Sequence, residues 1–250
     1  MRPPAGRRVG VTFPGNAERM RAILFDAGNT LVWLDHDFLI GVLRDAGVET
    51  TSAELLAAEH DAKLNIDRRL REGRGGTDES RARAYFAEVF RTVGLTDDAF
   101  PAVAKTLYAR HAERNLWCSV RERTAETLEE LRRRGYRLGV VSNSDGRVDA
   151  LLSDVGLRPY FDVVVDSGTE GVEKPDPRIF AIACERMGVD AAETAYVGDI
   201  YEIDVTGARA AGLHPYLVDP LSRWAEMDCD RITDLPDLLA SFPAMGDGDE

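Results

Sequence analysis

The sequence predicts an α/β protein in which a parallel sheet is joined by helices and carries an α-helical insert after its first strand. Short apolar runs bounded by turn residues alternate with helical patterns, which is typical of a parallel sheet with crossover helices. Residues 36–116 break this alternation, because they contain helical patterns and no convincing strand. The chain of 250 residues is long enough for one core domain and a smaller insert.

Five segments have the character of buried strands, since they are short and apolar and are bounded by turn residues. In chain order, the predicted strands are "AILF" (22–25), "RLGVVS" (137–142), "FDVVVD" (161–166), "TAYVG" (194–198) and "HPYLV" (214–218).

The helices between these strands have recognisable ends. The segment "RERTAETLEELRRRG" (121–135) ends in a basic turn followed by glycine. The segment "DPRIFAIACERMG" (176–188) begins with Pro177 in its first turn and stops at Gly188. The segment "EIDVTGARAAG" (202–212) is short and rich in small residues, which suits close packing against a sheet.

The insert has helix signals of its own. Thr51 and Glu54 in "TSAE" are spaced as in a capping box at a helix start. The segment "ESRARAYFAEVFRTVG" (79–94) has the pattern of an amphipathic helix that ends at its glycine.

Composition limits the classes of function. The protein has a net charge of −13 and a pI near 4.8. Because this negative charge repels polyphosphates, we expect no nucleic-acid partner. No apolar run approaches transmembrane length, and the N-terminus lacks the apolar stretch of a signal peptide. Cys118, Cys184 and Cys229 lie far apart, which indicates neither a disulfide framework nor a zinc site. We therefore expect a cytoplasmic protein with no membrane partner.

Polar side chains follow the predicted strands, at the edge of a parallel sheet where ligands bind. Each has a common structural role by itself, such as a turn or a helix cap. Their occurrence in order, next to successive elements of one sheet, is what predicts a functional site. They are Asp26 after the first strand, Ser142 and Asn143 after the second, Lys174 before a helix, and Asp199 and Asp204 after the fourth strand.

The three aspartates at this edge predict a metal site. Carboxylates crowded together repel one another, and a divalent cation relieves the repulsion. Oxygen ligands without histidine or cysteine favour Mg²⁺. Lys174 and Ser142 can then hold an anion beside the metal, so the set suits phosphoryl transfer.

Four motifs in this order resemble those of the haloacid dehalogenase superfamily, whose members are mostly magnesium-dependent phosphatases. The motifs are "FDAGNTL", "VVSNSD", "EKPDP" and "VGDIYEIDVTGARAAG". The resemblance implies a Rossmann-like parallel sheet core from 20–34 and 117–242, with an α-helical cap at 35–116 that closes over the site. Residues 1–19 are then a loose N-terminal extension and 243–250 a tail.

The resemblance also implies roles for individual residues. Asp26 attacks phosphorus and forms an aspartyl-phosphate, which water then hydrolyses. Mg²⁺ is held by Asp26, the Gly28 carbonyl and Asp199, with support from Asp204 directly or through water. The phosphoryl group is bound by Ser142, Lys174 and the amides of Ala27, Gly28 and Asn143, while Thr30 fixes the loop around Asp26.

Gly28 departs from the family pattern, because most of its phosphatases have a second aspartate there that acts as general acid and base. Three explanations remain open. The substrate can have a better leaving group, as sugar C1 or acyl phosphates do. The cap can supply the acid or base, with His36, His60 and Lys63 as candidates that also suit surface or packing roles. The chemistry can also differ, since the family's dehalogenases and phosphonate-cleaving members lack this aspartate as well.

The alternatives fit less well. The resemblance implies a Ser-Asn pair in the family's dehalogenases at the position where this chain has Gly198 and Asp199. Those enzymes need no magnesium, so the fourth motif argues against dehalogenation. Phosphonate cleavage needs a cap lysine for a Schiff base, and we expect Lys63 to be solvated. A catalytically weak protein that binds phosphate ligands is a further alternative. The sequence thus predicts a magnesium-dependent phosphatase for a small phosphorylated metabolite, with sugar phosphates as one candidate class.

Overall fold

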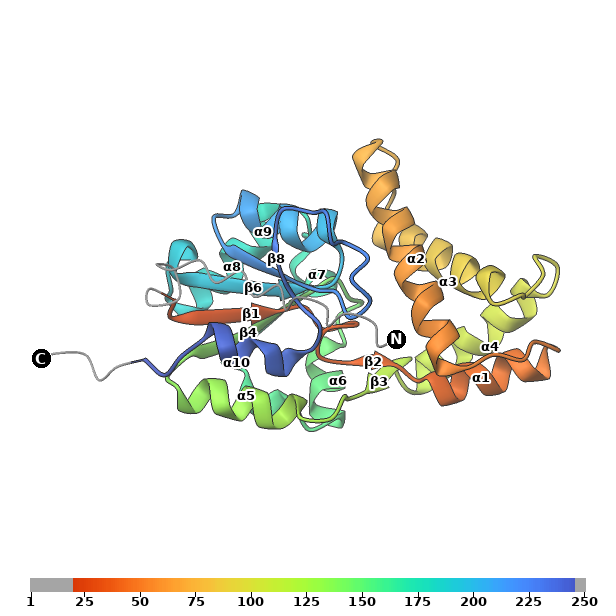
Figure 1. The fold of residues 1–250 in the computed structure, drawn as a ribbon, viewed down its shortest axis with the longest axis horizontal. Coiled ribbons are helices and arrows are strands. Elements are labelled where there is room, and N and C mark those ends of the chain that lie inside the picture. Colours follow the sequence, from red (N-terminus) through yellow and green to blue (C-terminus); the bar gives the residue numbers. More distant parts are fainter. Residues whose placement is uncertain (1–19, 246–250) are drawn as a thin grey trace, which may run out of the picture.

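The computed structural model describes residues 20–245, and these form an α/β core with a group of helices beside it (Figure 1). The core sheet has six strands in the order β5-β4-β1-β6-β7-β8, and all neighbouring pairs are parallel. This confirms the predicted fold class. The strands are β1 (Ala22–Phe25), β4 (Arg137–Ser142), β5 (Val163–Asp166), β6 (Thr194–Gly198), β7 (His214–Val218) and β8 (Asp230–Ile232).

Helices cover both faces of this sheet because the central strands are apolar on both sides. In β1, Ile23 and Phe25 belong to one apolar cluster, and Ala22 and Leu24 belong to another on the opposite face. The first face is covered by α5 (Thr124–Arg133), α6 (Val148–Asp154) and α10 (Leu238–Ser241), and the second by α8 (Pro177–Met187) and α9 (Thr206–Ala210). Figure 1 shows the two groups on either side of the strands.

The residues between β1 and the rest of the sheet form four helices with an apolar cluster of their own. These helices are α1 (His36–Asp45), α2 (Ser52–Arg71), α3 (Asp78–Thr92) and α4 (Phe100–Glu113). Thr51 and Glu54 form the predicted capping box at the start of α2. The helical group joins the core through β2 (Trp33–Leu34) and β3 (Trp117–Ser119), which pair antiparallel and act as a two-stranded connection.

Helix α2 also holds the helical group against the core through polar contacts at its C-terminal half. Asp67 accepts hydrogen bonds from the backbone N–H of Glu202 (2.8 Å) and from the indole N–H of Trp224 (2.6 Å). Arg71 forms an ion pair with Glu202 at 2.9 Å. Asp67 is fully buried in this contact, so the seam between α2 and the core is closed.

Several element ends differ from the sequence expectation. The strand predicted at 161–166 begins at Val163, and β8 was not predicted, because its three residues show no apolar run. The helix predicted at 202–212 begins as a π-helix (Tyr201–Val205) and continues as α9. The remaining short elements are α7 (Ser167–Glu170) and the 3₁₀ turns Arg158–Tyr160, Ala191–Glu193 and Leu235–Asp237.

Cys118, Cys184 and Cys229 are all free. Within residues 20–245, no helix combines the length and the apolar character that crossing a membrane requires. The predicted N-terminal extension and the last five residues of the predicted tail lie outside the described residues.

Candidate active site

The predicted strand-end residues meet at one edge of the sheet, around a cavity of about 710 Å³. Asp26 follows β1, the central strand, and its backbone N–H bonds to the Val197 carbonyl of β6 at 2.8 Å. Because β1 lies between β4 and β6, the residues after these strands come close to Asp26. The cavity is lined by Asp26, Ala27, Gly28, Ser142, Asn143, Lys174, Asp199 and Asp204.

Three buried carboxylates form a cluster that fits a divalent cation. One oxygen each of Asp26, Asp199 and Asp204 lies within 4.8 Å of the others. Burial raises the pKa of Asp26 to about 7, against the opposing effect of Lys174, and the charges of Asp204 and Asp199 raise it further. Burial also raises the pKa of Asp199. Such carboxylates gain from a nearby cation, which favours their charged forms.

Asp204 is held in place by hydrogen bonds to the backbone and by close packing against Gly198. Oδ2 accepts hydrogen bonds from the backbone N–H groups of Asp199 (3.0 Å) and Ile200 (2.9 Å). The carboxylate also packs against Gly198, where a Cβ would lie 2.4 Å from Cγ of Asp204. Only glycine fits this close approach, which explains the "GD" pair physically. Asp204 therefore supports the backbone at Asp199 as well as the charge of the cluster.

Lys174 joins two of the carboxylates. Its ammonium group lies 2.8 Å from Oδ1 of Asp26 and 2.8 Å from Oδ1 of Asp204, and the side chain is 2% exposed. Burial alone would lower the pKa of Lys174, but the charges of Asp204 and Asp26 outweigh that effect and raise it. Lys174 is therefore a fixed cation beside the carboxylate of Asp26.

Tyr196 is a member of this network that the sequence did not reveal. Its hydroxyl accepts a hydrogen bond from Lys174 Nζ (2.8 Å) and lies 3.0 Å from Oδ1 of Asp204 and 3.1 Å from the Val141 carbonyl. Burial, followed by the charge of Asp204, raises its pKa well above the usual value. The neutral hydroxyl thus connects the lysine to the sheet, although "TAYVG" has only the pattern of a core strand.

The remaining predicted residues have distinct surroundings. Ser142 is buried at the end of β4. The side chain of Asn143 accepts from the backbone N–H of Lys174 (2.8 Å) and donates to its carbonyl (3.1 Å), so it fixes the lysine's backbone. Thr30 is fully buried and does not line the cavity, and its Oγ1 has no hydrogen-bond partner among the described residues. Its location is therefore within the loop and not on the cavity wall.

Lys63 of α2 reaches the site, so the expectation of a solvated lysine was wrong. Its ammonium group lies 2.7 Å from Oδ2 of Asp199, and its side chain is 1% exposed. The segment around Lys63 looks polar and surface-like in the sequence. Its partner Asp199 lies far away in the sequence, so the local sequence pattern cannot reveal this contact.

The two histidines considered as acid or base candidates do not line the cavity. His60 is buried and its Nδ1 lies 2.8 Å from the Leu56 carbonyl. Burial, followed by the charge of Lys63, lowers the pKa of His60 to about 4. Nε2 of His36 lies 2.5 Å from Oε1 of Glu59, within hydrogen-bond distance. Both histidines therefore have structural partners inside the helical group.

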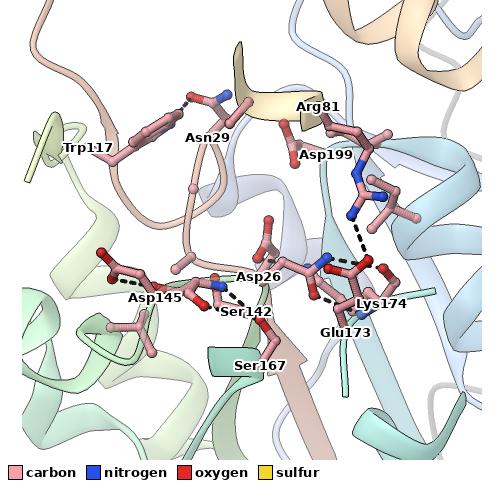
Figure 2. Close-up of a pocket in the computed structure, with 18 of the residues that line it drawn as sticks. Asp26, Asn29, Arg81, Trp117, Ser142, Asp145, Ser167, Glu173, Lys174 and Asp199 are labelled. Carbon is pink, nitrogen blue, oxygen red and sulfur yellow. Dashed lines mark hydrogen bonds and ion pairs between the residues drawn. The ribbon is translucent and has the colours of Figure 1, made fainter. Parts of the chain in front are cut away.

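Two further contacts lie at the cavity wall, one from β3 of the connection and one from α3 of the helical group, and sequence reasoning missed both. Figure 2 shows the indole of Trp117 bonded to Asn29, and Arg81 directed at Glu173. The indole N–H donates to Oδ1 of Asn29 at 3.2 Å, and Arg81 Nη2 lies 3.3 Å from Glu173 Oε1. Glu173 precedes Lys174, so Arg81 ties α3 to the loop that carries the lysine.

Residues 20–212 match the family model described as "Hydrolase: haloacid dehalogenase-like hydrolase". The chain belongs to the haloacid dehalogenase-like hydrolase family. It is 33% identical over 233 residues to the mouse (Mus musculus) haloacid dehalogenase-like hydrolase domain-containing protein 3, covering 86% of this chain and 92% of the relative.

Other relatives of this hydrolase bear activity names. It is 28% identical over 227 residues to a glyceraldehyde 3-phosphate phosphatase from Methanopyrus kandleri, covering 90% of this chain and 94% of the relative. In fold it is similar to the HAD-hydrolase YfnB from Bacillus subtilis bound to magnesium, with a TM-score of 0.65 and 23% identity over 89% of this chain and 98% of that one. The family and the fold agree with the resemblance in the four motifs, and the chain is a hydrolase whose phosphatase relatives are consistent with a phosphoric monoester hydrolase.

Proposed function

We propose that this hydrolase is a magnesium-dependent phosphatase that acts on a small phosphorylated metabolite, with sugar phosphates as the favoured class. The observation that carries the proposal is the position of Asp26, which lines the cavity and lies 2.8 Å from the Lys174 ammonium within a cluster of three carboxylates. The phosphatase relatives support the same reaction class. The free cysteines support a cytoplasmic location.

Asp26 is the proposed nucleophile. Its carboxylate oxygen forms a bond to phosphorus while the ester oxygen leaves with its electron pair, which gives an aspartyl-phosphate. Water then attacks phosphorus, inorganic phosphate leaves, and the Asp26 carboxylate is restored. Lys174 orients the carboxylate throughout and balances charge on the transferring group, for which Ser142 and the loop amides of Ala27 and Gly28 are the proposed partners.

The proposed ligands of Mg²⁺ are Asp26, Asp199 and the Gly28 carbonyl. Asp204 is proposed to support the ion directly or through water. The chemistry that Mg²⁺ supplies when bound is neutralisation of charge on the phosphoryl oxygens. Lys63 lies on Asp199 from the cap side and adds a second cation to the same cluster.

The absence of a carboxylate at position 28 bears on the substrate. A general acid typically contributes about 10²–10⁴-fold to the rate, and its loss matters least when the leaving group needs no proton. We therefore favour phosphorylated compounds with good leaving groups, such as sugar C1 phosphates, which are esters, or acyl phosphates, which are mixed anhydrides.

Phosphonate cleavage is kept as a second candidate because Lys63 lies inside the site. A Schiff base at Lys63 requires a free amine, and the ion pair with Asp199 would first have to break. Trapping by borohydride in the presence of a carbonyl-bearing phosphonate would distinguish this candidate from a phosphatase.

A panel of phosphorylated metabolites, assayed with Mg²⁺ and with EDTA, tests the proposal. We expect release of phosphate that EDTA abolishes. Asp26→Asn should abolish it as well, because the amide cannot attack phosphorus, while Asp154→Asn at an exposed site on α6 should have no effect. Activity that survives EDTA or the Asp26→Asn change would contradict the proposed mechanism.

A further inference from the structure

The space beside Gly28 is filled by an aromatic side chain from another part of the chain. A Cβ placed on Gly28 would lie 3.5 Å from both Cδ1 and Nε1 of the Trp117 indole. This is ordinary van der Waals distance, so one carbon fits, whereas atoms that extend farther toward the ring do not. Trp117 belongs to β3, the second strand of the connection between core and cap. The position without a carboxylate is therefore walled by an indole.

The indole is held in this place by a chain of hydrogen bonds. Its N–H donates to Asn29, whose Nδ2 donates to the Tyr85 hydroxyl at 3.4 Å. Tyr85 donates in turn to Oε2 of Glu59 at 3.0 Å. Asn29, Tyr85 and Glu59 are all buried. Asn29 has a φ of 52°, a conformation that asparagine tolerates better than most residues. The network fixes the ring before any substrate arrives.

The indole of Trp117 and the carboxylate of Asp26 line the same cavity, so the indole is a candidate wall for the leaving group of a phosphate ester. In-line displacement places the leaving oxygen opposite the attacking Asp26 carboxylate. Asp26 rises from the sheet edge, so the leaving group points away from the sheet and toward the cap side of the cavity. Figure 2 shows Trp117 and Asn29 in the upper half of the cavity with Arg81 of the cap, and Asp26 below them. The apolar side chains on this wall include Trp117, Tyr85, Ala82 and Ile66.

We propose that Trp117 is a specificity-determining residue whose indole packs against the leaving group of the substrate. A preorganised indole face favours a flat or C–H-rich ring, such as an aromatic ring or the ring of a sugar. The substrate class is thus a phosphate monoester with a ring next to the ester oxygen. This inference rests on the proposed phosphatase function and specifies it further.

Two substrates that differ in the leaving group test the role of Trp117. 4-Nitrophenyl phosphate presents a flat ring, and acetyl phosphate presents almost no surface to the wall. We expect Trp117→Ala to lower kcat/KM for 4-nitrophenyl phosphate about tenfold, mainly through KM, and to change acetyl phosphate hydrolysis by less than about twofold. Trp117→Phe keeps a ring and should retain most of the activity on both. Tyr108→Ala removes an exposed aromatic residue of α4 and should change neither.

A merely structural role for Trp117 would lower both activities by the same factor, and that result would overturn the inference. An unchanged KM for 4-nitrophenyl phosphate in Trp117→Ala would overturn it too. If the wild-type protein hydrolyses neither compound with Mg²⁺, the metabolite panel decides the proposed function, and the inference is tested by binding. For this, calorimetry compares Asp26→Asn with Asp26→Asn/Trp117→Ala. We expect about tenfold weaker binding of 4-nitrophenyl phosphate and unchanged binding of inorganic phosphate, and equal losses for both ligands would contradict the inference.

Discussion

The ammonium group of Lys63 in α2 lies 2.7 Å from Oδ2 of Asp199 in the core, and both side chains are almost fully buried. Asp199 is also a proposed ligand of Mg²⁺. In the structure the cluster contains three carboxylates and the two ammonium groups of Lys63 and Lys174. A residue of the helical group therefore neutralises part of the charge that a metal ion would otherwise neutralise.

Replacing Lys63 should strengthen Mg²⁺ binding. The Lys63 ammonium and a divalent cation both gain from the Asp199 carboxylate, so each reduces the gain of the other. We expect Lys63→Met to lower the Kd for Mg²⁺ about tenfold, which corresponds to about 1.4 kcal/mol. Isothermal titration calorimetry at fixed ionic strength measures this.

Lys105→Met is the matched control for this prediction, because Lys105 is an exposed lysine of α4 in the same cap. It removes the same charge from the protein and should leave the Kd unchanged. Weaker Mg²⁺ binding by Lys63→Met would show that the lysine supports the metal site and does not compete with the ion.

Position 28 should tolerate one added carbon and no more. Gly28→Ala places Cβ at ordinary contact distance from Trp117 and should change the free energy of unfolding by less than about 1 kcal/mol. Gly28→Asp adds atoms that compete with the indole for space and should cost about 1–3 kcal/mol. Urea denaturation of each variant, without metal, measures the difference.

The second half of this prediction is that Trp117→Ala removes the penalty. In a double-mutant cycle, Gly28→Asp should cost markedly less in the Trp117→Ala background, because the ring is gone. Additive effects of the two changes would mean that residue 28 and the indole do not compete for space.

Tyr196→Phe should destabilise the protein and remove one hydrogen-bond partner of the Lys174 ammonium group. The hydroxyl accepts from the lysine and lies within hydrogen-bond distance of Asp204 and of the Val141 carbonyl. Its loss leaves buried polar groups with fewer partners, which costs about 1–3 kcal/mol. Thermal or denaturant unfolding checks this, with Tyr108→Phe, an exposed tyrosine, as the control. Equal stability of the two variants would contradict the prediction.

The buried Asp67 should make the seam between α2 and the core sensitive to pH. Burial raises the pKa of Asp67 from its usual value of 3.8 to about 6, against the hydrogen bonds from Glu202 and Trp224. Between these values the folded protein keeps a proton that the unfolded chain releases, so this group's contribution to stability falls as pH rises from about 4 to above 6. A shift of this size corresponds to about 3 kcal/mol at most.

Comparison with Asp67→Asn isolates this effect. Other groups change the stability of both proteins with pH, so the relevant quantity is the difference in the free energy of unfolding between them. As pH rises from 4 to 7, the wild type should lose stability relative to Asp67→Asn. A constant difference across this range would show that Asp67 has an ordinary pKa.

The fold and the core of the site could be predicted because they depend on local patterns. Apolar runs mark the strands, and parallel strands must end at the same edge, so Asp26, Ser142 and Asp199 were expected to converge. The short strand β8 was missed because Asp230–Ile232 contains one apolar residue, and it forms by pairing with β7.

The contacts across the cap could not be predicted in the same way. Lys63 lies in a polar stretch, and only the docking of α2 brings it to Asp199. In the sequence, Trp117 looks like an ordinary apolar residue. Only the geometry of the connection between β2 and β3 brings its indole against Gly28. Tyr196 lies in a segment with the pattern of a core strand, and nothing in the neighbouring sequence indicates that its hydroxyl contacts Lys174. In each case the partner lies far away in the sequence.

The strand Trp117–Ser119 that joins cap and core also supplies part of the cavity wall. A rotation of the cap about this connection would move the indole together with the helices, so access to the site and the shape of its wall change in one motion. For the evolution of this hydrolase, the joint itself is then a place where substrate range can diverge. Under the proposed role of Trp117, a single replacement there would change which substrates the enzyme accepts, while the proposed nucleophile and the helices α1–α4 keep their sequences.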